Sequence, residues 1–271
     1  MKKWLTLFAV CGYLSSTAQE LFVFTEPASN MPRNSLGVRV NNRLMTGSMD
    51  KGYRLEPELM AGLSRKLMLH LALYAANIYS AKLKTEGGSV YMKYRLLSND
   101  AVHAHFRMAA FAKASVSNEP VQRFPYNDID LDGNNSGWQL GVVATRLINK
   151  LALSSSVSYL NAMNNFNGNK LDVTQPHHAA NYSFSAGYLL FPKEYTSYRQ
   201  TNVNIMVEYL GQQFINNKGG YNEVCPAIQF IFNSIARLDI GAKYTVWSTA
   251  EKMFRNTYLV RLEYNFLNLF K

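Results

Sequence analysis

Residues 236–247 read ARLDIGAKYTVW, a stretch in which apolar and polar side chains alternate. Leu238 and Ile240 share one side of an extended chain, whereas Arg237 and Asp239 share the other. Because successive side chains of a β-strand point to opposite faces, this pattern predicts a strand with one apolar and one charged face. It is longer than the strands of soluble sheets, which have about five or six residues, and it suits a tilted membrane strand, which needs about 9–11.

The same alternation recurs along the chain beyond residue 34. It predicts twelve strands, at residues 35–46, 53–64, 67–77, 88–98, 101–115, 137–148, 151–163, 178–191, 202–214, 221–233, 236–247 and 257–270. Every other connection is tight, with one longer exception, whereas the intervening connections are mostly longer and polar. Short turns that alternate with longer loops are typical of an outer-membrane β-barrel, and an even number of strands returns both chain ends to the periplasmic side.

Outward-facing aromatic residues are sorted by depth along these strands. They lie either near the loop ends or near the turn ends: Trp138, Tyr159, Tyr182, Tyr209, Tyr244 and Tyr258 in the first group, and Tyr188, Phe232 and Phe266 in the second. Aromatic rings gather at both interfaces of a membrane, so two such girdles indicate a membrane-crossing wall. The predicted fold class is therefore all-β: a transmembrane, antiparallel, up-and-down barrel of about twelve strands.

The composition excludes two other classes. No run of about 18 apolar residues follows the N-terminal stretch, which excludes a helical membrane protein. The chain has 13% aromatic and only 17% charged residues, which excludes an intrinsically disordered protein.

Two prolines, Pro57 and Pro226, fall inside predicted strands. Proline has no backbone N–H to donate to a sheet ladder. We therefore expect each proline to lie at a β-bulge, or where its strand extends above the membrane.

The start of the chain has the three parts of an export signal. Residues 2–3 are lysines, residues 4–14 are mostly apolar, and residues 15–18 are small. This order predicts a signal peptide that is cleaved after Ala18. Its removal takes two lysines from a chain of net charge +10, which leaves +8, and it leaves Cys225 without a disulfide partner. An exported basic chain is expected to meet an anionic glycolipid surface rather than nucleic acid.

The predicted organisation has three parts: the signal peptide at 1–18, an N-terminal periplasmic segment or mouth plug at 19–34, and the barrel at 35–271. The middle part begins with an apolar run and continues as a loop bounded by prolines. It either folds into the periplasmic mouth or extends as a short arm, and the sequence leaves both open.

The stretch Thr25–Pro32 (TEPASNMP) that leads into Ser35–Val40 resembles a group of uncharacterised small Gram-negative outer-membrane barrels described as porin-like transporters. The chain end resembles the assembly signal of outer-membrane barrels, since Tyr264, Phe266 and Phe270 share one face of the last strand. The resemblance implies a twelve-stranded barrel in the outer membrane that meets the barrel-assembly machinery. It implies no particular substrate.

The inward faces of the predicted strands hold charged side chains that are candidates for lining the lumen: Arg39, Arg43, Arg54, Glu56, Glu58, Lys93, Arg95, Arg107, Lys113, Glu208, Glu223, Arg237, Asp239, Lys243, Arg261 and Glu263. Ten are cations and six are carboxylates, which predicts a weak positive excess. A twelve-stranded barrel lies between filled eight-stranded and open sixteen-stranded ones. An open lumen and a plugged lumen whose charges cancel in salt bridges both stay open.

Two local patterns are candidates for metal binding. His103 and His105 point the same way from one strand, as a pair of imidazoles that chelates a transition metal would. Asp128, Asp130 and Asp132 place carboxylates at alternate positions like the opening of a calcium loop, although the final glutamate of that motif is missing. Ordinary polar side chains are the simpler interpretation of both patterns, so no cofactor is predicted.

The sequence contains no nucleophile elbow, P-loop, dinucleotide fingerprint or paired-cysteine motif, so we do not expect an enzyme. We predict a passive channel or transporter for small solutes in the outer membrane, with a weakly anion-leaning lumen. Its expected partners are outer-membrane lipids and glycolipid, the assembly machinery and the solutes. Two alternatives stay open: a plugged structural or binding barrel and, less favoured, a lipase or protease active at the rim.

Overall fold

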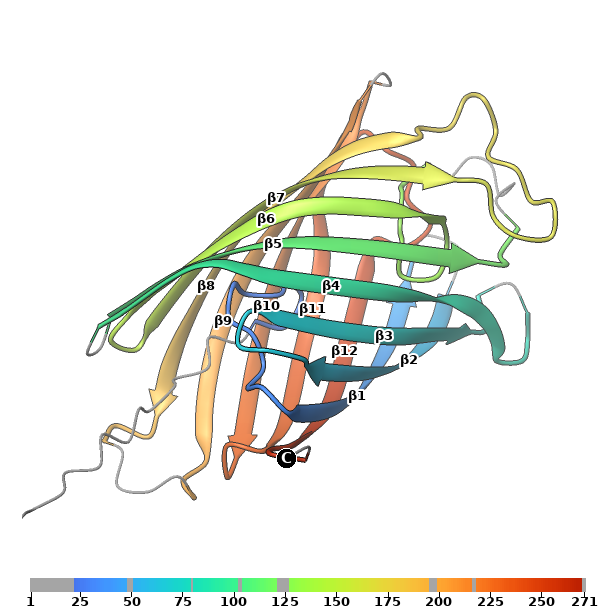
Figure 1. Ribbon diagram of the computed structural model, residues 1–271. Coiled ribbons are helices and arrows are strands. Elements are labelled where there is room, and N and C mark those ends of the chain that lie inside the picture. Colours follow the sequence, from blue (N-terminus) through green and yellow to red (C-terminus); the bar gives the residue numbers. More distant parts are fainter. Residues whose placement is uncertain are drawn as a thin grey trace, which may run out of the picture.

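The computed structural model describes residues 22–47, 51–78, 80–101, 104–120, 127–194, 199–215 and 218–269. Within them, twelve antiparallel strands close into a barrel in which β12 pairs with β1 (Figure 1). The strands are β1 (Ser35–Thr46), β2 (Lys51–Gly62), β3 (Leu67–Ala76), β4 (Lys84–Ala101), β5 (Ala104–Ser117), β6 (Ser136–Ile148), β7 (Leu151–Met163), β8 (His178–Phe191), β9 (Asn202–Ile215), β10 (Gly220–Phe232), β11 (Ala236–Ser248) and β12 (Asn256–Phe266). The predicted all-β, twelve-stranded antiparallel barrel is confirmed.

The strand bounds follow the predicted ranges closely, with two exceptions. The last strand, predicted to reach residue 270, ends at Phe266 and is followed by a turn, and β4 begins well before residue 88. Gly87 and Gly88 interrupt the alternation there, so the sequence pattern hides the start of the strand. A Cβ on Gly87 would lie 2.0 Å from the carbonyl oxygen of Val116 on β5, so only glycine allows the two strands to approach. The early start places the buried carboxylate of Glu86 inside the barrel.

Of the two alternatives expected at the prolines, the β-bulge is not found, and the extension above the membrane stays a prediction. Pro57 pairs with Val40 on β1, and Pro226 pairs with Val207 on β9. On the other side of each strand, the pairing is interrupted at the proline and then resumes in the same register. This holds for β2 with β3 and for β10 with β11. The register shift of β10 lies at residues 222–223 instead. A missing N–H affects only one of the two ladders, so a short gap accommodates each proline.

The wall of the barrel exposes apolar side chains and buries charged ones, which is the reverse of a soluble protein. Leu44, Leu73 and Val157 are exposed on the outer surface, whereas Lys93 and Arg54 are only 0% and 1% exposed. Because side chains alternate between the faces of a strand, one face of the wall is apolar and the other is polar. An apolar outer band and a polar interior are the arrangement of a transmembrane barrel.

Among the described residues, no helix is long and apolar enough to cross a membrane. The barrel has two ends, which we name by their connections. The turn end carries the short connections, such as residues 63–66 between β2 and β3, and the loop end carries the longer ones, such as the connection between β5 and β6.

Closure of the barrel predicts resistance to SDS. Every strand pairs on both sides, so no free edge is left where unfolding can begin. We expect the mature chain, purified in detergent, to migrate differently on SDS gels before and after boiling. Circular dichroism of the two samples should show strand content only in the unboiled one. A mature chain that is soluble without detergent and rich in helix would contradict the fold.

Candidate functional site

The structure places the charged side chains of the predicted lumen set as follows. Buried in the barrel are Arg39, Arg54, Glu56, Lys93, Arg107, Glu208, Glu223, Arg237, Asp239, Arg261 and Glu263. Half-buried are Arg43, Glu58, Arg95, Lys113 and Lys243. The guanidinium of Arg95 lies at the turn end and donates to the carbonyl of Arg65. That these residues line a conducting path stays a prediction.

Opposite charges pair across neighbouring strands of the interior. Arg39 contacts three carboxylates, with N–O distances of 2.8 Å to Glu26, 3.2 Å to Glu58 and 2.8 Å to Glu263. Glu263 also accepts from Arg237 at 2.6 Å. An unpaired buried charge costs several kcal/mol, so such networks are what allows the wall to hold these groups.

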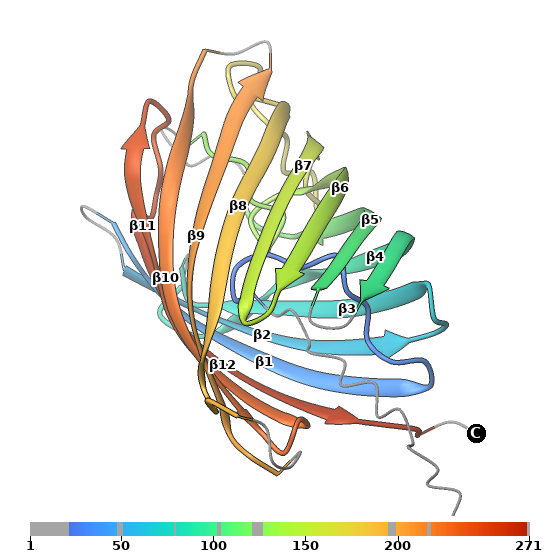
Figure 2. The same ribbon diagram turned by 90° about the vertical axis from the view of Figure 1, so that its left-hand side faces the viewer.

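Residues 22–34, called the plug from here on, lie within the ring of strands (Figure 2). The backbone N–H groups of Val23 and Phe24 donate to Oε1 of Glu208 at 2.9 and 2.8 Å. The hydroxyl of Thr25 donates to Oε2 of the same carboxylate at 2.6 Å. Glu208 is fully buried on β9, so a single wall carboxylate holds three donors of the plug.

The next residues of the plug also bind wall side chains. The Nζ of Lys93 donates to the carbonyl of Pro27 at 2.6 Å and lies 3.7 Å from Glu26, and the N–H of Ala28 donates to Oγ1 of Thr145 at 2.9 Å. Burial alone would raise the pKa of Glu26, but the charges of Arg39 and Lys93 outweigh it and hold that pKa well below its ordinary value. Glu26 is therefore ionised at neutral pH.

One glycine of the wall makes room for an aromatic ring of the plug. A Cβ on Gly241 would lie 2.9 Å from Cε2 of Phe24, whereas a Cβ on Gly187 would make an ordinary contact of 3.4 Å with Cε1 of Phe22. Phe22 packs in a buried cluster with Met206 and other apolar side chains. Wall and plug are thus matched in shape as well as in hydrogen bonding.

Residues 127–135, called the lumen loop from here on, cross the barrel near its loop end. They belong to the connection between β5 and β6, yet the N–H of Asn127 donates to the carbonyl of Glu251 at 3.0 Å. The N–H of Glu251 donates back to Oδ1 of Asn127 at 2.9 Å. Glu251 lies between β11 and β12, on the opposite side of the ring, so the loop spans the lumen.

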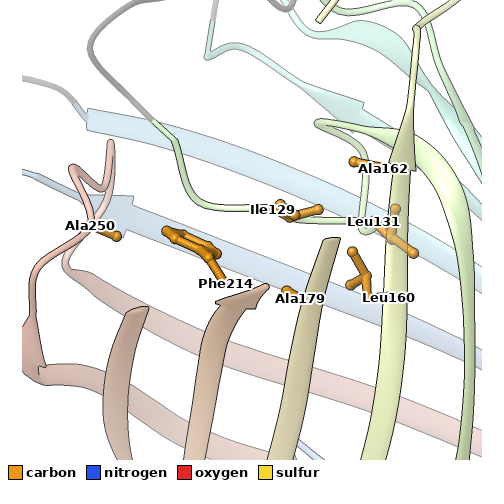
Figure 3. Close-up of a cluster of buried hydrophobic side chains, with 7 residues drawn as sticks. All are labelled: Ile129, Leu131, Leu160, Ala162, Ala179, Phe214 and Ala250. Atoms are coloured by element: carbon orange, nitrogen blue, oxygen red, sulfur yellow. The ribbon is translucent and has the colours of Figure 1, made fainter. Parts of the chain in front are cut away.

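A small apolar cluster holds the lumen loop in place (Figure 3). Ile129 and Leu131 pack against wall side chains near the loop end, which include Leu160, Ala179 and Phe214. The backbone of Ile129 also exchanges two hydrogen bonds with the side-chain amide of Gln212, at 3.1 and 2.9 Å. Ile129 and Leu131 thus anchor the loop to the wall, and Asp130 and Asp132 of the same loop contact wall cations.

The three aspartates of the calcium-like motif lie on the lumen loop, and two of them contact wall cations. Asp130 lies 3.0 Å from Arg54, and Asp132 contacts both Lys113 and Arg43. Burial opposes ionisation of Asp132, but these cations hold its pKa well below the ordinary value.

Asp128 lies in a different environment. Its pKa is raised to about 6 by burial and by the charges of Asp130 and Glu223, although Lys252 opposes this shift. Among the described residues, no three histidine, cysteine, aspartate or glutamate side chains converge as metal ligands. Calcium binding by Asp128, Asp130 and Asp132 stays an untested hypothesis.

The histidine pair is only half described. His103 lies outside the described residues, and Nδ1 of His105 lies 3.1 Å from a carboxylate oxygen of Asp100. His70, on the inner face of β3, has its Nδ1 2.6 Å from Glu58 and its ring 5.2 Å from that of Tyr91. The transition-metal hypothesis therefore stays untested.

A cavity of about 380 Å³ borders both the plug and the lumen loop. Among the described residues, its charged lining consists of seven cations and seven carboxylates: Arg39, Arg43, Arg54, Lys113, Lys243, Lys252 and Arg261, and Glu26, Glu56, Glu58, Asp128, Asp130, Asp132 and Glu223. Four of the carboxylates belong to the plug and the lumen loop. The lining is thus balanced in charge, although the strands alone carry more cations than carboxylates.

Several members of this site were absent from the predicted set. Glu26 lies in an irregular segment, Glu86 lies before the predicted start of β4, and Lys252 lies in a loop, where it contacts Glu223 and covers the ring of Tyr221. None of them lies in a region of clear alternation. Only the proline-bounded composition around Glu26 marked its segment as unusual.

The barrel is similar to solved outer-membrane barrels. It matches the COG4313 outer membrane channel from Pseudomonas putida F1 with a TM-score of 0.57 at 10% identity, over 90% of this chain and 100% of that one. It matches the NanC porin with a TM-score of 0.51 at 12% identity, over 84% of this chain and 98% of that one. No family model matches the sequence, and no curated protein matches it. At these identities the likeness shows a shared fold.

Proposed function

We propose that this chain is an outer-membrane channel through which small solutes pass passively, and that the plug narrows it in the conformation described. The observation that carries the proposal is the content of the lumen: two irregular segments and a cavity occupy it, rather than packed wall side chains. Either segment can move without breaking a strand pair, since the strands pair only with one another. The fold shared with an outer membrane channel and a porin supports the same function.

We further propose how the barrel sits in its membrane. The apolar outer face contacts lipid, the loop end faces outward toward anionic glycolipid, and the turn end faces the periplasm. Tyr264 and Phe266 contribute to recognition by the barrel-assembly machinery, while Phe270 and the predicted signal peptide at 1–18 lie outside the described residues.

The lumen is proposed to be only weakly selective for charge. The strands carry the positive excess from which a weak anion preference was predicted, but the plug and the lumen loop add Glu26, Asp128, Asp130 and Asp132 to the cavity lining. Fixed charges concentrate the opposite mobile ion only where they leave a net field. The anion preference of the wall should therefore emerge when these segments move or are neutralised.

A plugged binding barrel is the second candidate, and the many contacts of the plug favour it. Planar-bilayer recording of the refolded mature chain separates the two, because only a channel gives stepwise ionic current. We expect small steps from the wild type and larger ones from a variant with a loosened plug. An absence of current from both, in samples shown to be folded by the gel test, would favour the binding barrel. Release of fatty acid or peptide fragments by the same sample would instead indicate a rim enzyme.

A further inference from the structure

The wall holds the plug largely through groups that every peptide has. Glu208 accepts two successive backbone N–H groups, Thr145 accepts a third, and Lys93 donates to a backbone carbonyl. Acceptors and a donor of the wall are thus set along one segment that bends at residues 23–25, at positions that suit backbone amides and carbonyls. These contacts need no particular side chain on the bound segment.

A smaller number of wall contacts recognise particular side chains of the bound segment. Arg39 pairs with the carboxylate of Glu26 at 2.8 Å, and the gap at Gly241 receives the ring of Phe24. The hydroxyl of Thr25 reaches Glu208 at 2.6 Å. The preferred occupant therefore bends as residues 23–25 do and carries an aromatic residue two positions before an acidic one.

The cavity gives a route to this part of the wall from the loop end. It borders Phe24, Thr25 and Glu26 as well as the lumen loop. Of the wall side chains that bind the plug, Arg39 lines this cavity, so a solute that enters the cavity meets the side chain that pairs with Glu26.

From this geometry we infer that the lumen wall around Glu208, Thr145, Lys93 and Arg39 is a binding site for short peptides, and that the plug occupies it as an intramolecular ligand. The inference rests on the proposed channel function and names peptides as its solutes. Saccharides lack the successive amide N–H groups that donate to Oε1 of Glu208. Simple ions have neither these backbone groups nor an aromatic ring that would fill the gap at Gly241. Peptides therefore fit the site better than either class.

The test uses the full mature chain with Val23→Pro and Phe24→Pro, which loosens the plug and leaves the wall intact. The probe is the blocked heptapeptide acetyl-FVFTEPA-amide, which copies residues 22–28. A shorter blocked tetrapeptide, acetyl-FTEP-amide, tests whether short peptides in general bind, and maltotriose serves as a non-peptide solute. We expect both peptides to block the current and maltotriose to have no effect. A glutamine in place of the peptide's glutamate should weaken the block about tenfold, because the charged contact with Arg39 is lost.

Wall variants locate the site. Glu208→Gln and, separately, Thr145→Val should weaken the block by both peptides, whereas Asp172→Asn on the exposed loop between β7 and β8 should leave it unchanged.

A folded barrel that conducts but is blocked equally by maltotriose, or by neither peptide, overturns the inference and leaves the channel function standing. If no variant conducts, the channel function fails, and fluorescence polarisation of a labelled heptapeptide decides the site. Saturable binding that Glu208→Gln weakens supports it, and no binding overturns it.

Discussion

Replacing Val23 and Phe24 with proline is expected to release the plug and to raise the single-channel conductance severalfold. Proline has no backbone N–H, so the double variant removes both donors to Oε1 of Glu208. A hydrogen bond to a charged group contributes about 1.5–3 kcal/mol, so the docking of the plug weakens by about 3 kcal/mol or more. That corresponds to a shift of about a hundredfold toward the undocked state. Planar-bilayer recordings of refolded protein measure the change.

Two further variants show whether the lost hydrogen bonds are the cause. Val23→Ala keeps both N–H groups and the ring of Phe24, so it should raise the conductance far less than the proline variant. Gly241→Val acts from the wall, because its Cβ would lie 2.9 Å from the ring of Phe24, and it should raise the conductance without any change in the plug. Equal conductance of the wild type, the proline variant and the Gly241 variant, all folded by the gel test, would show that the plug does not narrow the lumen.

The barrel itself was predictable because a membrane wall requires an apolar side chain at every second residue of each strand. A wall between hydrocarbon and a polar interior forces alternation, and stretches such as residues 236–247 carry it without interruption. The prediction failed locally where alternation stops being informative. Gly87 and Gly88 have no side chain to show a face, so the start of β4 and the buried Glu86 were missed.

The contents of the lumen were much harder to predict. Val23 and Glu208 are 185 positions apart in the sequence, and no periodic pattern links an irregular segment to the strand that binds it. The sequence therefore left the plug and the periplasmic arm as equal alternatives. The same limit applies to the lumen loop, whose aspartates were interpreted as a calcium-like motif or a solvated turn, whereas Asp130 contacts Arg54 inside the barrel.

These segments also explain why the charge of the lumen could not be summed from strands alone. Alternation assigns Arg43, Arg54 and Lys113 to the inner face, and the structure places them there. Their nearest carboxylates include Asp130 and Asp132, which come from the lumen loop. The positive charge of the wall is offset by carboxylates from separate segments. The net charge of the lumen can therefore change when these segments move, without a change in the wall.

Asp130→Asn together with Asp132→Asn is accordingly expected to turn a weakly selective lumen into an anion-preferring one. The change removes two negative charges from a balanced lining and leaves Arg43, Arg54 and Lys113 with fewer partners. Asparagine keeps the side-chain oxygen of residue 130 that accepts the N–H of residue 132, so the loop should keep its conformation. We expect the anion-to-cation permeability ratio to rise by about threefold, because an uncompensated positive field concentrates anions in a narrow pore.

The reversal potential in a potassium chloride gradient measures this change, and it is best recorded in the background with the loosened plug, where the current is larger. Asp172→Asn is the matched control, because it removes one negative charge from an exposed loop and should not move the reversal potential. High salt should diminish the difference between the variants, since screening shortens the reach of fixed charges. A reversal potential that moves toward cation preference, or moves equally in the control, would show that the aspartates of the lumen loop do not set the field that permeating ions meet.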